Sequence, residues 1–311
     1  STVKNLSITN ATVSGGSYIG ILAGSVSSGA TIENISTSGS ATSSSNRVGG
    51  IAGNNDGNIT NSSSSASVVM NGPTAGEGTT SVGAGGLVGW LSGRIEGSSA
   101  TGSVTATGVT DAVGGLVGYM TGAANVDESY ASGPVQPECE GFSDYIGGLI
   151  GEMTNGTTLT ASYASGSVSA SDCAQVGGLV GQAAGGATLL SNVFAAGAVQ
   201  GDSRVGGLVG LASAMTIEDS YSTGAVSGVA ASVGGLIGIQ QNATASNSFW
   251  DTETSTQGTS ATPSSGVVIG LPTEDMEKLS TFDDIWDIGD GWQSGETWGI
   301  CDGTTYPFLI W

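Results

Sequence analysis

Val-Gly-Gly-Leu-Val-Gly stands at residues 113–118, 176–181 and 205–210. Five variants of this hexapeptide begin at Ile19, Val48, Ala84, Ile146 and Val233. Successive starts lie 28 to 36 residues apart. Such a period is too regular for chance and far longer than a coiled-coil heptad. The eight copies therefore predict a repeat protein.

Each copy is followed by two further segments that favour β-strands. One is TLTASYASG at 158–166 or TIEDSYSTG at 216–224, and the other is a short stretch such as 225–227. Gly, Ser, Asn and Asp separate the segments, as they do at corners. Three strands with three corners form one coil, and stacked coils pair at about 4.8 Å. We therefore predict an all-β protein, a β-solenoid (β-helix) of about eight three-strand coils.

Aromatic residues recur at one position of five successive repeats, where equivalent side chains of stacked coils would align. These residues are Tyr130, Tyr163, Phe194, Tyr221 and Phe249. Ser36 and Ser99 occupy the same position in earlier repeats. The pattern predicts an aromatic ladder along the rod.

The repeated glycines indicate tight corners or close backbone approach. Strict alternation along a strand would place Leu179 and Val180 on opposite faces, although both are apolar. Either a bulge intervenes or the outer face is covered.

On these residues the chain resembles the GLUG-repeat family. The signature is Gly-Gly-Leu-Val-Gly at 85–89, 114–118, 177–181 and 206–210, with Asp219-Ser220-Tyr221 and Ser248-Phe249-Trp250-Asp251 downstream. The resemblance covers roughly residues 1–255, and the repeats themselves span residues 1–251. It implies a β-solenoid from a large surface protein, adhesin-like or belonging to a peptidase precursor, and it implies location better than activity.

After residue 251 the period stops. Residues 252–266 are rich in Ser, Thr and Gly and predict a linker, and 267–311 predict a small aromatic-rich C-terminal cap. Thr273 before an acidic run predicts an N-capped short helix. Trp286, Trp292, Trp298 and Trp311 predict that the cap covers the exposed edge of the last coil. The N-terminal residues 3–13 match the later part of a coil, which predicts an uncapped first coil.

The charge balance excludes several classes of partner and chemistry. The chain has 26 acidic and 5 basic residues and no histidine. Nucleic acid and anionic membranes are excluded as partners because both need clustered Lys and Arg. No apolar run is long enough for membrane insertion. Without histidine there is no Ser-His-Asp triad, Cys-His pair or HExxH zinc site.

Carboxylates are the remaining candidates for chemistry or metal binding. Neighbours on a strand point to opposite faces, so Asp127 with Glu128 and Glu218 with Asp219 do not converge on a glycosidic bond. Calcium is the one cofactor left open, and its candidate ligands lack the spacing of an EF-hand loop. Those candidates are Asp283, Asp284, Asp287 and Asp290.

Cys139 and Cys173 lie shortly before successive glycine motifs, so they would meet at one corner of adjacent coils in a disulfide. Cys301 is left over as a buried thiol of the cap, or as a partner for another chain or one of the first two cysteines. Seven Asn-x-Ser/Thr sequons suit an exported glycoprotein. Their asparagines are Asn5, Asn10, Asn34, Asn58, Asn61, Asn155 and Asn242.

Together these features predict a secreted, extracellular or cell-surface protein without enzymatic activity, the rod-like shaft of an adhesin. Its partner would be a glycan, a host or a neighbouring-cell surface. One alternative is a fibre subunit that stacks on copies of itself through the uncapped N-terminal coil. A carbohydrate-active β-helix enzyme is a minor alternative. Ice or crystalline-polysaccharide binding would need regular Thr-x-Thr ladders, which are not evident.

Overall fold

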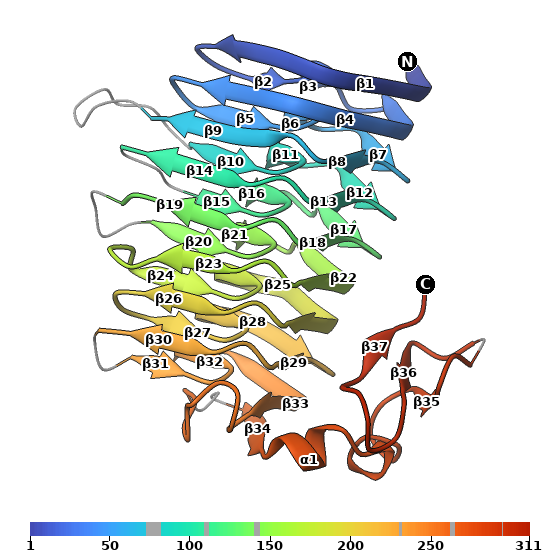
Figure 1. Cartoon of the computed structure of the whole chain (residues 1–311), viewed down its shortest axis with the longest axis vertical. Helices are drawn as coiled ribbons and strands as arrows, with labels where there is room; N and C mark the ends of the chain where they lie inside the picture. The colour runs from blue at the N-terminus through green and yellow to red at the C-terminus, as the bar shows by residue number, and fades with distance from the viewer. Residues whose placement is uncertain (73–81, 109–111, 140–143, 230–231, 262–264, 294) are drawn as a thin grey trace.

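The computed structural model describes residues 1–72, 82–108, 112–139, 144–229, 232–261, 265–293 and 295–311. Its described part is a stack of coils, with strands running across the long axis of the molecule (Figure 1). All strand pairs between coils are parallel, and the α-helix α1 spans only Thr273–Met276. The predicted all-β solenoid is confirmed.

The glycine motif builds a sheet of eight parallel strands, one for each coil. The strands are β2 (Ile19–Gly20), β5 (Arg47–Gly49), β10 (Gly83–Gly85), β15 (Ala112–Gly114), β20 (Tyr145–Gly147), β24 (Gln175–Gly177), β27 (Val205–Gly206) and β31 (Val233–Gly234). Each predicted motif start pairs with the next, from Ile19 with Val48 to Val205 with Val233. The eight predicted repeats are therefore the eight coils.

The rest of the coils forms a second sheet of 26 strands. After the motif come β3 (Ala23–Val26), β6 (Ala52–Asn55), β11 (Val88–Leu91), β16 (Val117–Met120), β21 (Ile150–Thr154), β25 (Val180–Ala195), β28 (Val209–Glu218) and β32 (Ile237–Gln241). The next positions hold β1 (Thr2–Gly15), β4 (Thr31–Ser43), β7 (Asn58–Thr60), β12 (Arg94–Glu96), β17 (Asn125–Asp127), β22 (Thr158–Ala164) and β33 (Thr244–Asp251), then β8 (Ser63–Ser64), β13 (Ser99–Ala100), β18 (Tyr130–Ala131) and β29 (Tyr221–Ser222). The coil closes with β9 (Ser67–Asn71), β14 (Val104–Thr107), β19 (Val135–Pro137), β23 (Val168–Ala170), β26 (Val199–Gly201) and β30 (Val226–Gly228), and β34 (Ser265–Leu271) adds a last strand beside β33.

The number of strands in a coil varies, which differs from the expected three. The coil that starts at Gln175 has three strands, β24 to β26, whereas the coil that starts at Gly83 has five, β10 to β14. The extra breaks come from corners within the long segment. One of these corners has a left-handed backbone conformation in all eight coils and in β1 before the first motif, with φ between 42° and 57°. It is formed by Asn5, Asn34, Asn61, Gly97, Glu128, Ala161, Asn192, Asp219 and Asn247.

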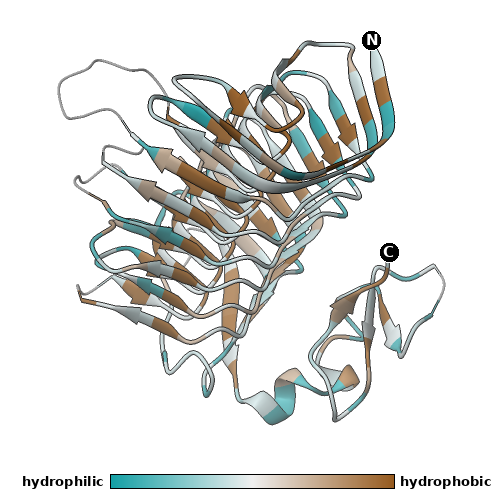
Figure 2. Ribbon diagram, turned by 45° about the horizontal axis from the view of Figure 1, so that its top comes forward, coloured by the Kyte–Doolittle hydropathy of each residue, from teal (hydrophilic) through white to brown (hydrophobic). Residues whose placement is uncertain are grey.

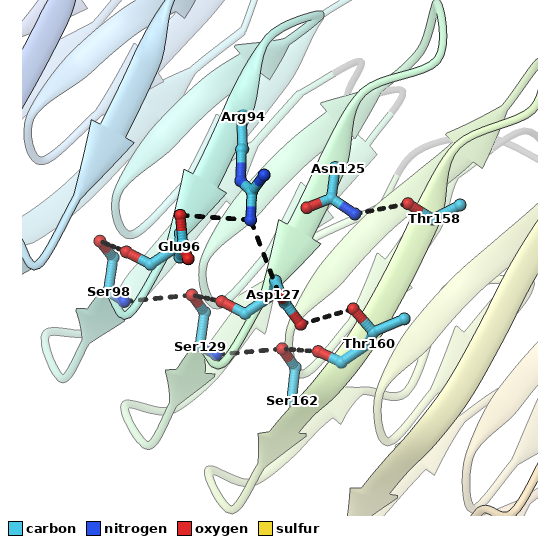
Figure 3. A network of polar contacts seen from close by, with 9 residues as sticks. All are labelled: Arg94, Glu96, Ser98, Asn125, Asp127, Ser129, Thr158, Thr160 and Ser162. Atoms are coloured by element: carbon cyan, nitrogen blue, oxygen red, sulfur yellow. Dashed lines mark hydrogen bonds and ion pairs between the residues drawn. The ribbon is translucent and has the colours of Figure 1, made fainter. Parts of the chain in front are cut away.

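A buried serine follows that corner in most coils. The Ser129 hydroxyl donates to the Asp127 carbonyl at 2.7 Å and accepts from the Ser98 amide at 3.1 Å. Ser162 repeats both bonds one coil later, as Figure 3 shows. A corner takes backbone amides out of the regular ladder, and a buried amide needs a partner. The serines supply that partner within the stack.

The interior of each coil is divided into two apolar compartments by a narrow waist. Leu116 and Val126 belong to one compartment, and Val113 and Val135 belong to the other. At the waist, a Cβ on Gly115 would lie 2.1 Å from the Gly148 carbonyl oxygen of the next coil and 2.9 Å from Ala131 Cβ. Glycine is required there because the backbone of one wall meets the opposite wall. Figure 2 shows the apolar residues distributed along the stacked coils.

The motif itself turns the corner between the two sheets. Strand β24 ends at Gly177 and β25 begins at Val180, so Gly178 and Leu179 lie in a bend. Leu179 and Val180 are both fully buried in the same compartment. A bend therefore replaces the bulge or covered outer face that strict alternation suggested.

Residues 252–261 run across the end of the last coil. The Gly235 amide donates to the Thr259 carbonyl, and the Ile237 amide donates to the Ser260 hydroxyl. Trp250, only 6% exposed, donates from Nε1 to the Gln257 carbonyl at 2.9 Å. With β34 beside β33, this stretch covers the C-terminal edge of the stack.

Candidate functional site

The aromatic side chains of the ladder lie in register on one side of the solenoid. The rings of Tyr130 and Tyr163 are 5.0 Å apart, those of Tyr163 and Phe194 are 4.7 Å apart, and those of Phe194 and Tyr221 are 5.1 Å apart. Each of these pairs is within 5° of parallel. Phe249 is paired with Tyr221 through the backbone but turns its ring toward Phe282 and Trp286 instead.

The C-terminal segment, residues 272–311, covers this ladder. It contains α1, the 3₁₀-helix η1 (Leu279–Thr281) and a small sheet of β35 (Ile288–Asp290), β36 (Trp298–Ile300) and β37 (Phe308–Leu309). Figure 1 shows it turning back beside the coils. Trp298 is fully buried 5.8 Å from Tyr221 and donates from Nε1 to Asn192 Oδ1 at 2.8 Å. The predicted aromatic cap therefore packs on Phe249 of the last coil and continues along the side of the stack over the ladder, while residues 252–261 cover the end itself.

A polar contact ties the segment to the last coil. Asp251 Oδ2 accepts hydrogen bonds from the Tyr306 hydroxyl at 2.6 Å and the Thr273 hydroxyl at 2.7 Å. Burial opposes ionisation of Asp251, but these bonds and those from the amides of Glu253 and Thr254 lower its pKa. Burial and the bond to Asp251 raise the pKa of Tyr306 to about 12. Thr273 therefore does not cap α1 as expected, since Pro272 holds the N-cap position and the Thr273 hydroxyl serves Asp251.

Towards the N-terminus the ladder position passes from aromatic residues to serines. Ser7, Ser36, Ser63 and Ser99 lie in register with Tyr130. They line a groove of about 350 Å³ that is rich in hydroxyl groups and ends at Tyr130. Trp311, 44% exposed, lies 6.3 Å from the Tyr130 ring. The solenoid thus presents a polar groove beside aromatic rings.

The carboxylates of the middle coils are engaged between coils. Arg94 lies 3.2 Å from Glu96 and 3.7 Å from Asp127, and Asp127 accepts from the Thr160 hydroxyl at 2.6 Å (Figure 3). Asn125 donates to Thr158 in the same network. Glu128 occupies the left-handed corner directly after Asp127. Asp127 therefore serves the contact between coils.

Glu218 and Asp219, the other carboxylate pair, also lie at the left-handed corner of a coil. Asp219 occupies the left-handed corner of its coil, directly after Glu218. Burial raises the pKa of Asp219, and the hydrogen bond that Asn247 Nδ2 donates at 2.9 Å partly offsets the rise. Asp219 therefore bridges neighbouring coils.

The four candidate calcium ligands do not converge. Asp287 accepts from the amide and hydroxyl of Thr297, and Asp290 accepts from the Asp302 amide. Asp283 and Asp284 are exposed. In the described part of the chain, no group of three or more His, Cys, Asp or Glu side chains could hold a metal ion.

Cys139 and Cys173 form a disulfide, with their Cα atoms 5.3 Å apart. Cys301 is a free, exposed cysteine. The expectation of a buried Cys301 thiol is wrong, because the turn at 301–304 lies on the outside of the C-terminal segment. A bond between Cys301 and another chain stays a prediction.

All seven sequon asparagines are exposed. Six of them, all except Asn58, have positive φ and lie at corners. Asn34 donates to Asn5 Oδ1 at 2.7 Å, and Asn155 donates to Thr121 Oγ1 at 3.2 Å. The sites are thus at the surface, and glycosylation of them stays a prediction.

One polar cluster was missed by the sequence analysis. Tyr18 and Arg47 each stand directly before a motif start, and Trp90 and Tyr119 each stand directly after a motif end. The structure stacks these four side chains. Aligning the residues that flank each hexapeptide would have found them.

Comparison with known proteins supports the repeat. The GLUG motif, "Glug: The GLUG motif", matches residues 44–69, 80–105 and 201–227. A "Putative Gly-rich membrane protein" of Evansella cellulosilytica is 37% identical over 124 residues, which is 37% of this chain and 13% of that protein. The chain therefore spans only a small part of that relative. No solved structure matches the chain.

No helix within the described residues is long and apolar enough to cross a membrane. The three motif matches fall on the second, third and seventh coils, and the remaining coils keep their register. The chain is a β-solenoid protein built from GLUG repeats.

Proposed function

We propose that this chain is a non-enzymatic, rod-forming and adhesive segment of an extracellular surface protein. The observation that carries the proposal is the continuous parallel pairing of the motif strands through eight coils, in which, among the described residues, each motif strand pairs with those of the neighbouring coils. Such a stack extends by adding coils, so it suits a shaft that holds a binding surface away from a cell.

Several features support an extracellular location. A disulfide joins adjacent coils, and disulfides persist in oxidising compartments. All seven sequon asparagines are exposed. The formal net charge of -21 keeps such a surface soluble.

The absence of enzymatic activity is part of the proposal. There is no histidine in the chain. Asp127 is paired with Arg94 and Thr160, and Asp219 is bonded to Asn247, so one carboxylate of each neighbouring pair contributes to coil stacking. A glycosidase needs two carboxyl groups that flank one bond.

Retention of coated beads under flow tests the adhesive function. Beads carrying the folded chain should be held on a glycoprotein-coated surface more strongly than beads carrying the same chain after reduction and heat denaturation. The soluble chain should sediment as a monomer. Equal retention of both bead types would contradict adhesion, filaments in electron micrographs would favour a fibre subunit, and release of reducing sugar from polysaccharides would favour an enzyme.

A further inference from the structure

A shallow pocket opens on the first three coils, at positions that the ladder does not use. It has a volume of about 470 Å³ and is lined by Tyr18, Ser25, Arg47, Asn54, Asp56 and Trp90. We call it the Arg47 pocket. Its residues flank the glycine motifs. Tyr18 directly precedes β2 and Arg47 is the first residue of β5, while Asn54 lies in β6 and Trp90 in β11 after the bend.

Arg47 is held between two aromatic rings. Its guanidinium lies 5.2 Å from the Tyr18 ring centroid and 3.9 Å from that of Trp90. The Tyr119 ring stacks on the other side of Trp90 at 4.1 Å. The side chains therefore form one column along the solenoid, and the column fixes the guanidinium in place.

A polar chain extends from the column across the pocket. Arg47 Nη1 donates to Asn54 Oδ1 at 2.6 Å, and Asn54 Nδ2 donates to Asp56 Oδ2 at 3.0 Å. Asp56 also accepts from the Ser92 hydroxyl. Cationic donors, an amide and an anionic acceptor thus lie in a row beside the 44% exposed ring of Tyr18.

The solenoid does not need these residues for its fold. Gly83 and Ala112 occupy the register position of Arg47 in the next two coils. At the position of Trp90 later coils carry Gln182 and Leu211. Arg47 Nε is also buried without a hydrogen-bond partner among the described residues, and burial lowers the pKa of Arg47. A buried donor without a partner destabilises the fold, so the cluster points to a role outside folding.

The arrangement fits a neutral, polyhydroxylated ligand. Sugar hydroxyl groups both donate and accept, so they match Asp56 and Arg47 at once, and the apolar C–H face of a sugar ring suits the exposed ring of Tyr18. Asp56 and the net charge of -21 oppose an anionic ligand, while Arg47 opposes a cationic one. We propose that the Arg47 pocket binds a neutral sugar residue of a glycan, an inference that rests on the adhesive function and names its ligand class.

The chain itself supplies replacements that its fold accepts. Arg47→Gln copies Gln175, which stands at the same register in a later coil, and Asn54→Ser copies Ser25. Arg204→Gln is the matched control, because Arg204 also directly precedes a glycine motif but has no aromatic partner of this kind within the described residues. Each variant, made in residues 1–311, is labelled at the exposed Cys301 and applied to an array of neutral, sialylated and sulfated oligosaccharides.

The wild-type chain and Arg204→Gln should bind neutral oligosaccharides equally. Arg47→Gln and Asn54→Ser should each lose about tenfold in apparent affinity, with unchanged circular dichroism and a melting temperature no lower than that of the wild-type chain. No binding to neutral oligosaccharides, binding confined to sialylated or sulfated ones, or unaltered binding by both pocket variants would each overturn the proposal. Bead retention separates the two proposals: retention that persists in Arg47→Gln leaves the adhesive function in place and removes only this pocket.

Discussion

At the scale of the residue, the solenoid depends on glycines that separate two walls by the width of a backbone. Gly115 lies where the wall of one coil meets Ala131, directly beneath the Gly148 carbonyl. The same contact recurs at Gly148 against Ala164 and at Gly178 against Ala195. Side-chain volume at these positions is therefore limited by backbone on one side and by a methyl group on the other.

Gly115→Ala should destabilise the fold by about 1–3 kcal/mol, because the new methyl group forces two backbone walls apart. Gly186→Ala is the matched control, since a Cβ at Gly186 meets no atom within 4 Å. Urea unfolding of both variants measures the difference. Equal stability of the two variants would contradict this prediction, because it would show that the waist accommodates a methyl group without loss of folding free energy.

At the scale of the element, two connections hold parts of the chain that the strand ladder does not. One is the disulfide between Cys139 and Cys173, which lie 34 residues apart and so close a loop of about one coil. The other is the contact of Tyr306 and Thr273 with Asp251, which ties the C-terminal segment to the last coil. The first connection predicts a response to reducing agents, and the second predicts a response to pH.

Replacing both Cys139 and Cys173 by Ala should lower the free energy of unfolding by about 3 kcal/mol, because the unfolded chain regains the entropy of the open loop. Cys301→Ser should leave stability unchanged, since this thiol is free and exposed. Denaturant unfolding with and without a reducing agent measures both effects. If a reducing agent lowers the free energy of unfolding of Cys301→Ser as much as that of the wild type, the result supports the Cys139–Cys173 disulfide. If the reducing agent changes neither value, the result contradicts this disulfide.

The contact with Asp251 predicts that the C-terminal segment is released at alkaline pH. Tyr306 has a pKa of about 12 against an ordinary value of 10.0, so its contribution is complete below pH 10 and is lost as the pH rises towards 12. The lowered pKa of Asp251 gives the opposite limit, a contribution present above its ordinary value of 3.8 and lost in stronger acid.

Tryptophan fluorescence follows this release, because Trp286 and Trp298 are buried against the ladder. Tyr306→Phe should make the alkaline transition less steep by removing one titrating group. Tyr119→Phe is the control, since that ring stacks on Trp90 in another part of the solenoid. An unchanged slope in Tyr306→Phe would show that the release does not depend on this phenol.

The strands could be predicted from the repeat, whereas the contacts between elements that do not repeat could not. A period of about 29 residues requires equivalent residues to align, so the motif starts and the ladder positions followed from spacing alone. The direction in which Trp298 packs depends on which apolar surface remains open after residues 252–261 have covered the last coil. The Arg47 column joins residues from the two ends of the hexapeptide, which a search for identical motifs passes over.

Across the whole molecule, the ladder side of the solenoid differs between its N-terminal and C-terminal halves. The C-terminal segment lies against the aromatic positions from Tyr130 onward, while the first coils carry Ser36, Ser63 and Ser99 at the same register and need no cover. The segment is therefore a cover for an apolar stripe. This makes the solubility of the solenoid depend on residues that are not part of any coil.

Deletion of residues 272–311 should leave the parallel coils folded but expose Tyr163, Phe194 and Tyr221. An exposed apolar stripe of stacked rings favours association, so the truncated chain should form dimers or larger species in light scattering while its β-sheet circular dichroism persists. Serine already stands at this register at four levels of the stack, so the fold accepts serine at the ladder position. Replacing the five ladder aromatics by serine in the truncated chain should restore the monomer. A truncated chain that stays monomeric with its aromatics intact would contradict the prediction, because it would show that the C-terminal segment is not needed to cover the ladder.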